Sequence, residues 1–155
     1  MLGIVREDRL LPWDNDIDMS IKEQYENKLL SCLKEISSSG YRVGTKEFTK
    51  DSRPFEKDRT SIIKVRNNRF FFFRGLDIYI KYKDNKQYFY QCGISKKVTD
   101  SSFFDTLDTI VFNSKIYNIP SNHEEYLRKK YANWQMLNKT WNTFIDDSSI
   151  IGYLQ

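Results

Sequence analysis

The most informative part of this sequence is Leu11-Pro12-Trp13-Asp14-Asn15-Asp16-Ile17-Asp18-Met19. In an extended segment successive side chains point to opposite faces, so Asp14, Asp16 and Asp18 would share one face. Three like charges this close together are unfavourable unless a cation neutralises them. Hard divalent ions such as Mg²⁺ bind carboxylate oxygens and keep phosphate oxygens as further ligands. The stretch therefore predicts a metal site that handles phosphate.

Two other interpretations of these carboxylates have to be weighed. A short cluster of Asp and Asn is commonly a solvated loop, and the spacing alone does not decide between loop and site. An EF-hand calcium loop begins with the same Asp-x-Asp-x-Asp pattern, but it requires Gly at its sixth position and Glu at its twelfth. Met19 and Tyr25 occupy those positions, so a calcium loop is excluded.

The residues after the acidic stretch favour an ordered site over a loose loop. Ser20 is followed three residues later by Glu23, a capping box that predicts a helix starting after Ser20 and stopping near Gly40. Apolar residues recur at helical spacing within this segment, at Tyr25, Leu29, Leu33 and Ile36. We therefore expect the carboxylates on a short strand that leads into a packed amphipathic helix.

The segment 2–18 resembles the core motif of the LicD/fukutin family, which belongs to the nucleotidyltransferase superfamily related to polymerase beta. The family pattern is Gly-Thr-Leu-Leu-Gly, a short spacer with an Arg, and then Pro-Trp-Asp-Asp-Asp-Ile-Asp. Asn15 replaces one Asp of that pattern. The residues that match it are Leu2, Gly3, Arg6, Pro12, Trp13, Asp14, Asp16, Ile17 and Asp18.

A second block that resembles the family lies at residues 119–127 and ends with Tyr131-Ala132-Asn133-Trp134. The family usually has Tyr-Gly-Asp-Trp there, so Ala132 and Asn133 depart from its pattern. The family's glycine motif is normally preceded by a helix, whereas this sequence begins inside the motif at Met1. We therefore expect one LicD-like nucleotidyltransferase-type domain over residues 1–155 that lacks the usual N-terminal helix.

The remaining pattern predicts a sheet and one further helix. A capping box of Ser121 and Glu124 predicts a helix over residues 122–131. Its basic residues Arg128, Lys129 and Lys130 should form a solvated face, and Asp146-Asp147 should form a turn. Strand-like segments occur at residues 41–48, 60–66, 70–82, 87–92 and 109–112. We expect an α+β fold, with a nucleotidyltransferase-like mixed β-sheet and helices packed mainly on one face.

Asp77 is the best candidate for a third carboxylate of the site. It lies in the hydrophobic segment Gly75-Leu76-Asp77-Ile78-Tyr79-Ile80, where a carboxylate is costly unless it is paired or bound to metal. Taken alone, alternation with Leu76 and Ile78 favours an Asp77 side chain that faces solvent. The superfamily, however, uses a third carboxylate on a later strand, and Asp77-Ile78-Tyr79 resembles the corresponding segment of LicD-like proteins.

Composition limits the classes of protein that fit. With 39% hydrophobic and 15% aromatic residues, the 155-residue chain can bury a core and is not disordered. The longest apolar run, residues 70–73, is too short to span a membrane, and two cysteines are too few for a disulfide framework. The net charge of +4 suits an anionic ligand, but the basic residues are scattered and no nucleic-acid-binding motif is present.

The resemblance implies a specific reaction. Family members transfer phosphocholine or a polyol phosphate from a CDP-activated donor to a glycan hydroxyl, with Mg²⁺ or Mn²⁺ as cofactor. By resemblance, Asp16, Asp18 and Asp77 are the catalytic and metal-binding residues. The residues expected to contact the donor are Gly3, Arg6 and Asp14.

The resemblance also implies a setting for this reaction. Bacterial members modify lipopolysaccharide, teichoic acid or capsule in the cytoplasm, and eukaryotic relatives act on glycoproteins in the Golgi lumen. The expected partners are therefore a CDP-activated donor and a glycan, with no nucleic acid and no membrane span. The alternative is a catalytically inactive LicD-like fragment that binds glycan or nucleotide without turnover.

Overall fold

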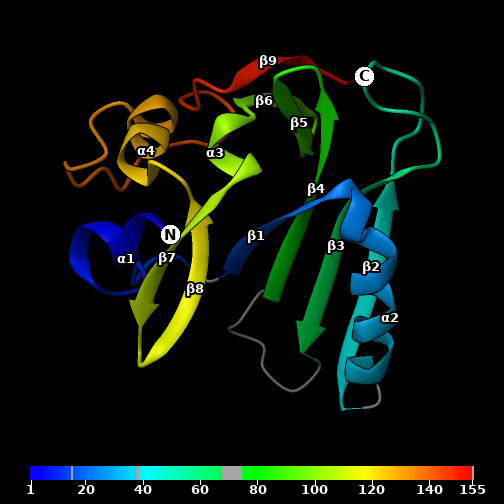
Figure 1. Ribbon diagram of the computed structural model, residues 1–155, viewed down its shortest axis with the longest axis horizontal. Helices are drawn as coiled ribbons and strands as arrows, with labels where there is room; N and C mark the ends of the chain where they lie inside the picture. Colours follow the sequence, from blue (N-terminus) through cyan, green and yellow to red (C-terminus); the bar gives the residue numbers. More distant parts are fainter. Residues whose placement is uncertain (15, 38, 68–74, 155) are drawn as a thin grey trace.

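The sheet of this protein is organised around its longest strand, β4 (Gly75–Asp84), in a computed structural model that describes residues 1–154 except 15, 38 and 68–74 (Figure 1). β3 (Thr60–Asn67) pairs antiparallel with the first half of β4. β1 (Asp16–Lys22) also pairs with this half, but it runs parallel to β4. β5 (Gln87–Cys92) pairs antiparallel with the last residues of β4. The expected mixed sheet is therefore present.

Further elements extend this sheet and pack around it. The sheet continues with β2 (Tyr41–Glu47) beyond β3, and with β6 (Ser95–Asp100) and β9 (Ile150–Tyr153) beyond β5. A separate hairpin consists of β7 (Leu107–Phe112) and β8 (Lys115–Pro120). The helices are α1 (Leu2–Glu7), the 3-10 turn η1 (Glu23–Tyr25), α2 (Glu26–Ser37), α3 (Ser102–Asp105) and α4 (His123–Tyr131).

Alternation along β4 separates a core face from a polar face. Ile78, Ile80 and Tyr82 point to one side and pack with Leu33 of α2. Figure 1 shows α2 lying over β2 on this side of the sheet. The other members of this buried cluster are Phe48, Phe55, Ile63 and Val65. The opposite face of β4 carries Asp77 and therefore belongs to the candidate site.

A smaller aromatic cluster attaches α3 and α4 to the sheet. Tyr88 of β5 packs edge-on against Phe104 of α3, with ring centroids 6.2 Å apart. Tyr126 of α4 contacts Phe103 and Phe104, with ring centroids 5.6 Å apart in both cases. Because Tyr88 and the core-packed Phe89 are successive residues of one strand, this cluster lies on the face opposite α2. The α+β class is confirmed, and the helices divide between the two faces of the sheet.

Most predicted elements are found, but the helix predicted to start after Ser20 starts later in the chain, as α2. Ser20 lies in β1, opposite Tyr79 of β4, and α2 begins only at Glu26. The Glu23 carboxylate accepts a hydrogen bond from the backbone N–H of Lys83 at 3.1 Å instead of capping a helix. Pairing with β4 thus prevails over the local capping signal. The first part of the strand predicted at residues 70–82 lies outside the described residues.

The second capping box is also wrong, although the helix it predicts is present as α4. The Ser121 hydroxyl donates to the backbone carbonyl of Ser102 at 2.8 Å, and Asn122 takes the N-cap position without a side-chain cap. Among the described residues, no helix is both long and apolar enough to cross a membrane.

Candidate functional site

Asp16 and Asp18 lie at the start of β1, as the sequence predicts, whereas Asp14, predicted on the same strand, precedes it. Asp16 and Asp18 are alternate residues of this strand and therefore share a face. The Asp14 side chain, in the loop before the strand, is hydrogen-bonded to Asp16. Burial, this hydrogen bond and the negative charge of Asp16 together raise the pKa of Asp14 above its usual value. The three side chains therefore crowd negative charge into one place.

Asp18 has the most strongly perturbed carboxyl group of the three. It reaches the molecular surface, but neighbouring protein atoms displace part of its hydration, and Asp16, Asp77 and Asp14 add negative charge around it. These effects outweigh the positive charge of Lys130 and raise the pKa of Asp18 to about 6. A bound cation would relieve this unfavourable charge.

Asp77 lies directly opposite Asp18 in the parallel pair of β1 and β4. Its carboxylate is held by β3: Lys64 donates to it at 2.5 Å, and Arg66 donates to its other oxygen. Burial works against the charged form, but these two cations hold the pKa of Asp77 below its usual range. Asp77 is therefore next to the acidic stretch, with its own charge already balanced by Lys64 and Arg66.

A glycine allows Arg66 to reach this position. Gly75 has φ = +119°, and a Cβ atom there would lie 2.3 Å from the Val65 carbonyl oxygen and 2.7 Å from Nη1 of Arg66. The same Nη1 donates to the carbonyl oxygens of Val65 and Leu76 at 3.0 Å. Arg66 is thus fixed by the backbone as well as by Asp77.

Gly3 and Arg6, which resemble the family's donor-binding residues, both lie in α1 and have structural contacts. Gly3 is buried, and a Cβ atom there would be 2.5 Å from the carbonyl oxygen of Arg9. The Arg6 guanidinium binds the Glu7 carboxylate and donates to the backbone carbonyl of Trp134 at 3.2 Å. Gly3, which matches the family's glycine motif, thus lies in a helix, and Arg6 attaches that helix to the chain after α4.

Lys130, predicted on a solvated face, is a half-buried neighbour of the site. Its Nζ lies 5.9 Å from the ring centroid of Tyr90 and 3.7 Å from the Asp147 carboxylate, and its positive charge acts on Asp18. Asp147, predicted in a turn, forms a buried ion pair with Lys97 at 2.8 Å. Sequence analysis missed both residues, because their contacts join segments far apart in the chain.

Another lysine is buried beside this group. Lys81 of β4 is only 1% exposed, and its Nζ lies 3.8 Å from the ring centroid of Tyr90 and 4.4 Å from that of Phe104. Burial, with Lys130 and Lys97 nearby, lowers the pKa of Lys81 well below its usual value. Side chains alternate between the two faces of β4, so Asp77 and Lys81 share one face. This pattern in the sequence was a signal for charged groups on that face.

The charges on this face suit a metal cation bound by the carboxylates, which in turn binds an anionic ligand such as a phosphate. Carboxylates from the loop and β1 provide oxygen ligands, while Lys64, Arg66 and Lys130 provide positive charge around them. Within the described residues, no group of three or more His, Cys, Asp and Glu side chains is arranged as a metal site. Among the residues described, neither Asp16 nor Asp18, nor Asp14 beside them, is in ion-pair contact with a lysine or arginine, in contrast to Asp77.

Comparison with protein families gives a match that covers most of the chain. The family described as LicD/FKTN/FKRP, nucleotidyltransferase domain matches residues 1–122 of the 155. This region includes the acidic stretch and Asp77, and it stops just before α4, so the second block is largely outside it. No curated protein was found to match the chain. The family has a phosphotransferase-type role in glycan modification. The chain belongs to the LicD/FKTN/FKRP family of nucleotidyltransferase domains.

Proposed function

We propose that this protein transfers a phospho-group, phosphocholine or a polyol phosphate, from a CDP-activated donor to a glycan hydroxyl. In this reaction the acceptor oxygen forms a bond to the phosphorus, the bond from that phosphorus to CMP breaks, and the hydroxyl proton leaves. The crowded carboxylates of Asp14, Asp16 and Asp18 carry the proposal. Membership of the LicD/FKTN/FKRP family supports it.

The donor set fits a hard divalent cation. Carboxylate oxygens are the ligands that Mg²⁺ and Mn²⁺ prefer, and the raised pKa of Asp18 reflects negative charge that a cation would neutralise. Asp16 and Asp18 would hold the ion, and Asp14 would orient Asp16 by its hydrogen bond. When bound, the ion would offset negative charge at the transferred phosphorus and at the leaving nucleotide.

The other residues of this face would position the reactants. Asp77, opposite Asp18, is kept ionised by Lys64 and Arg66, so it can serve as a further ligand or accept the proton of the acceptor hydroxyl. Lys130 places a positive charge beside Asp18, where the phosphate oxygens of a donor would come to lie. The phosphate-binding role expected for Arg6 stays a prediction, because its guanidinium already binds Glu7 and the Trp134 carbonyl.

Two measurements on the same variants test this function. Thermal shift with CDP-choline and Mg²⁺ or Mn²⁺ reports donor binding, and release of CMP in the presence of candidate glycans reports transfer. Saturation at 100 times the dissociation constant should add about 2.7 kcal/mol to the stability, a shift of several degrees. Asp16→Asn and Asp18→Asn should lose the metal-dependent shift and the turnover.

A matched control carries the same substitution away from the site. Asp58 is an exposed residue of the loop between β2 and β3, at φ = +64°, a conformation that Asn tolerates. Asp58→Asn should bind and react like the wild type. Turnover that persists in both β1 variants would refute the assignment. Donor binding without turnover on any acceptor would favour the inactive binding protein.

A further inference from the structure

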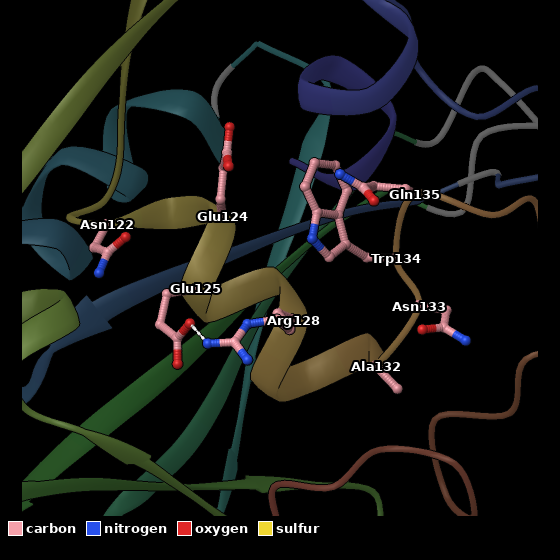
Figure 2. Close-up of a pocket in the computed structure, with 8 residues that line it drawn as sticks. All are labelled: Asn122, Glu124, Glu125, Arg128, Ala132, Asn133, Trp134 and Gln135. Atoms are coloured by element: carbon pink, nitrogen blue, oxygen red, sulfur yellow. Dashed lines mark hydrogen bonds and ion pairs between the residues drawn. The ribbon is translucent and has the colours of Figure 1, made fainter.

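A polar cavity of about 470 Å³ lies along the outer side of α4 and the chain that follows it (Figure 2). Trp134 provides its aromatic wall, and the amide side chains of Asn133 and Gln135 lie on the same segment. Glu124, Glu125 and Arg128 of α4 complete the part of the lining that bears charge. One indole surrounded by amide and carboxylate groups combines an apolar platform with many hydrogen-bonding groups.

The charge of this cavity does not suit a phosphate. Arg128 forms an ion pair with Glu125, and Figure 2 shows Glu124 pointing away from both. Among the residues that the structure describes, Glu124 has no ion-pair partner, so the lining carries one unbalanced negative charge. An anionic nucleotide would be repelled, whereas a neutral or amino-bearing ligand would not.

The cavity is joined to the carboxylates by α1. Arg6 donates to the Trp134 carbonyl at 3.2 Å and to that of Met136 at 3.4 Å. At the other end of this six-residue helix, the amino group of Met1 lies in the field of Asp14 and Asp18. A helix of this length spans only about 9 Å. The cavity is therefore within reach of the carboxylates for a ligand of a few linked sugar rings.

We propose that this cavity binds one neutral or amino-substituted sugar residue of the acceptor glycan. The indole of Trp134 would cover the apolar face of the ring. Asn133 and Gln135 would hydrogen-bond its hydroxyls, and the Glu124 carboxylate would accept from a hydroxyl or an ammonium group. This inference rests on the proposed function, since it identifies the substrate that receives the phospho-group.

The test uses the full chain on an array of neutral, amino-substituted, carboxylated and sulfated oligosaccharides. Neutral or amino-substituted members should bind, with anionic ones weaker. Trp134→Ala should weaken this binding by about tenfold, and Trp134→Phe by about threefold at most, since Phe keeps an aromatic platform. Trp141→Ala removes an indole that stacks on Tyr131, with ring centroids 4.7 Å apart, and should leave glycan binding unchanged.

A second variant, which removes the charge of Glu124, tests the proposal without changing Trp134. Glu124→Gln should selectively reduce binding of amino-substituted sugars, by about threefold to tenfold, and leave neutral sugars unaffected. The thermal shift with CDP-choline should stay as in the wild type for Trp134→Phe and Glu124→Gln, which separates loss of the acceptor from loss of the donor. The proposal would be overturned if the wild type bound no member of the array or preferred the anionic members. It would also be overturned if all of these variants bound the glycans as the wild type does.

Discussion

Asp18 of β1 and Asp77 of β4 face one another across a parallel strand pair, yet their surroundings act on them in opposite directions. Lys64 and Arg66 keep Asp77 ionised and lower its pKa. Partial loss of hydration, together with the carboxylates around it, raises the pKa of Asp18 to about 6. The pKa values of two neighbouring carboxyl groups are thus shifted in opposite directions. Such a difference is typical of acids that take different roles in one reaction. The difference is set by β3, which supplies cations to one strand and not to the other.

Loss of the Asp77 charge should destabilise the fold. Asp77→Asn leaves Lys64 and Arg66 beside each other without a counter-charge, in a part of the sheet where the Asp77 side chain is only 9% exposed. The expected cost at pH 7 is about 2–3 kcal/mol in the free energy of unfolding. Urea unfolding measures it, with Asp58→Asn as the control for the same chemical change at an exposed site. Equal stability of the two variants would contradict the ion-pair assignment.

The stability of the wild type relative to Asp18→Asn should depend on pH. The pKa of Asp18 is about 6 in the folded chain against an ordinary value of 3.8, so the folded state binds its proton first as the pH falls. The cost of the ionised carboxylate is therefore fully present above pH 6 and is relieved progressively between pH 6 and about pH 4. In chelator-treated buffer, Asp18→Asn should melt higher than the wild type at pH 7.5, and the gap should narrow by pH 4.5. A gap that does not change with pH would show that Asp18 has an ordinary pKa.

Part of this fold could be predicted because its signals are local. Alternation puts Asp16 and Asp18 on one face of a strand, and alternation in β4 separates Asp77 from Ile78. Asp77 was singled out by the resemblance to the family, and the parallel pairing places it opposite Asp18. The helix α4 was likewise predicted, although the capping box that indicated it does not form.

The remaining features depend on contacts between distant segments. Lys97 of β6 is buried only because Asp147, fifty residues later, lies against it, and a lysine-rich segment alone gives no sign of a buried strand. The short helix α1 is too small to be stable by itself and is held by the contact of Arg6 with the chain beyond α4. Asp77 was predicted as a ligand, but its two cations on β3 could be paired with it only once the strand register was known.

The end of α4 is strained at a position where the family has glycine. Ala132 has φ = +48° and ψ = −103°, a conformation that glycine adopts far more readily than alanine. Ala132→Gly should therefore stabilise the protein by about 1 kcal/mol. The matched control is Asn133→Gly, at the next residue, whose φ is not positive, and it should be neutral or destabilising. Chemical denaturation measures the free energy of unfolding of both variants. A loss of stability in Ala132→Gly would show that the alanine is not strained.

The buried ion pair of Lys97 and Asp147 should be the most sensitive position outside the hydrophobic core. Both side chains are almost inaccessible to solvent, and the Lys97 ammonium also donates to the carbonyl and hydroxyl of Thr143. Asp147→Asn removes a carboxylate that is ion-paired with both Lys97 and Lys130, and it should cost about 3–5 kcal/mol, enough to unfold a marginal domain.

Removing both charges of the Lys97–Asp147 pair separates the contribution of charge to the stability from the contribution of packing. Replacement of Lys97 by Met together with Asp147→Asn should recover part of the stability that Asp147→Asn loses, because the buried ammonium is then absent. Thermal and urea unfolding of the two single variants and the double variant give the coupling free energy. Additive losses in the double variant would mean that Lys97 and Asp147 stabilise the fold independently, and that the pair is not the link between β6 and the segment before β9.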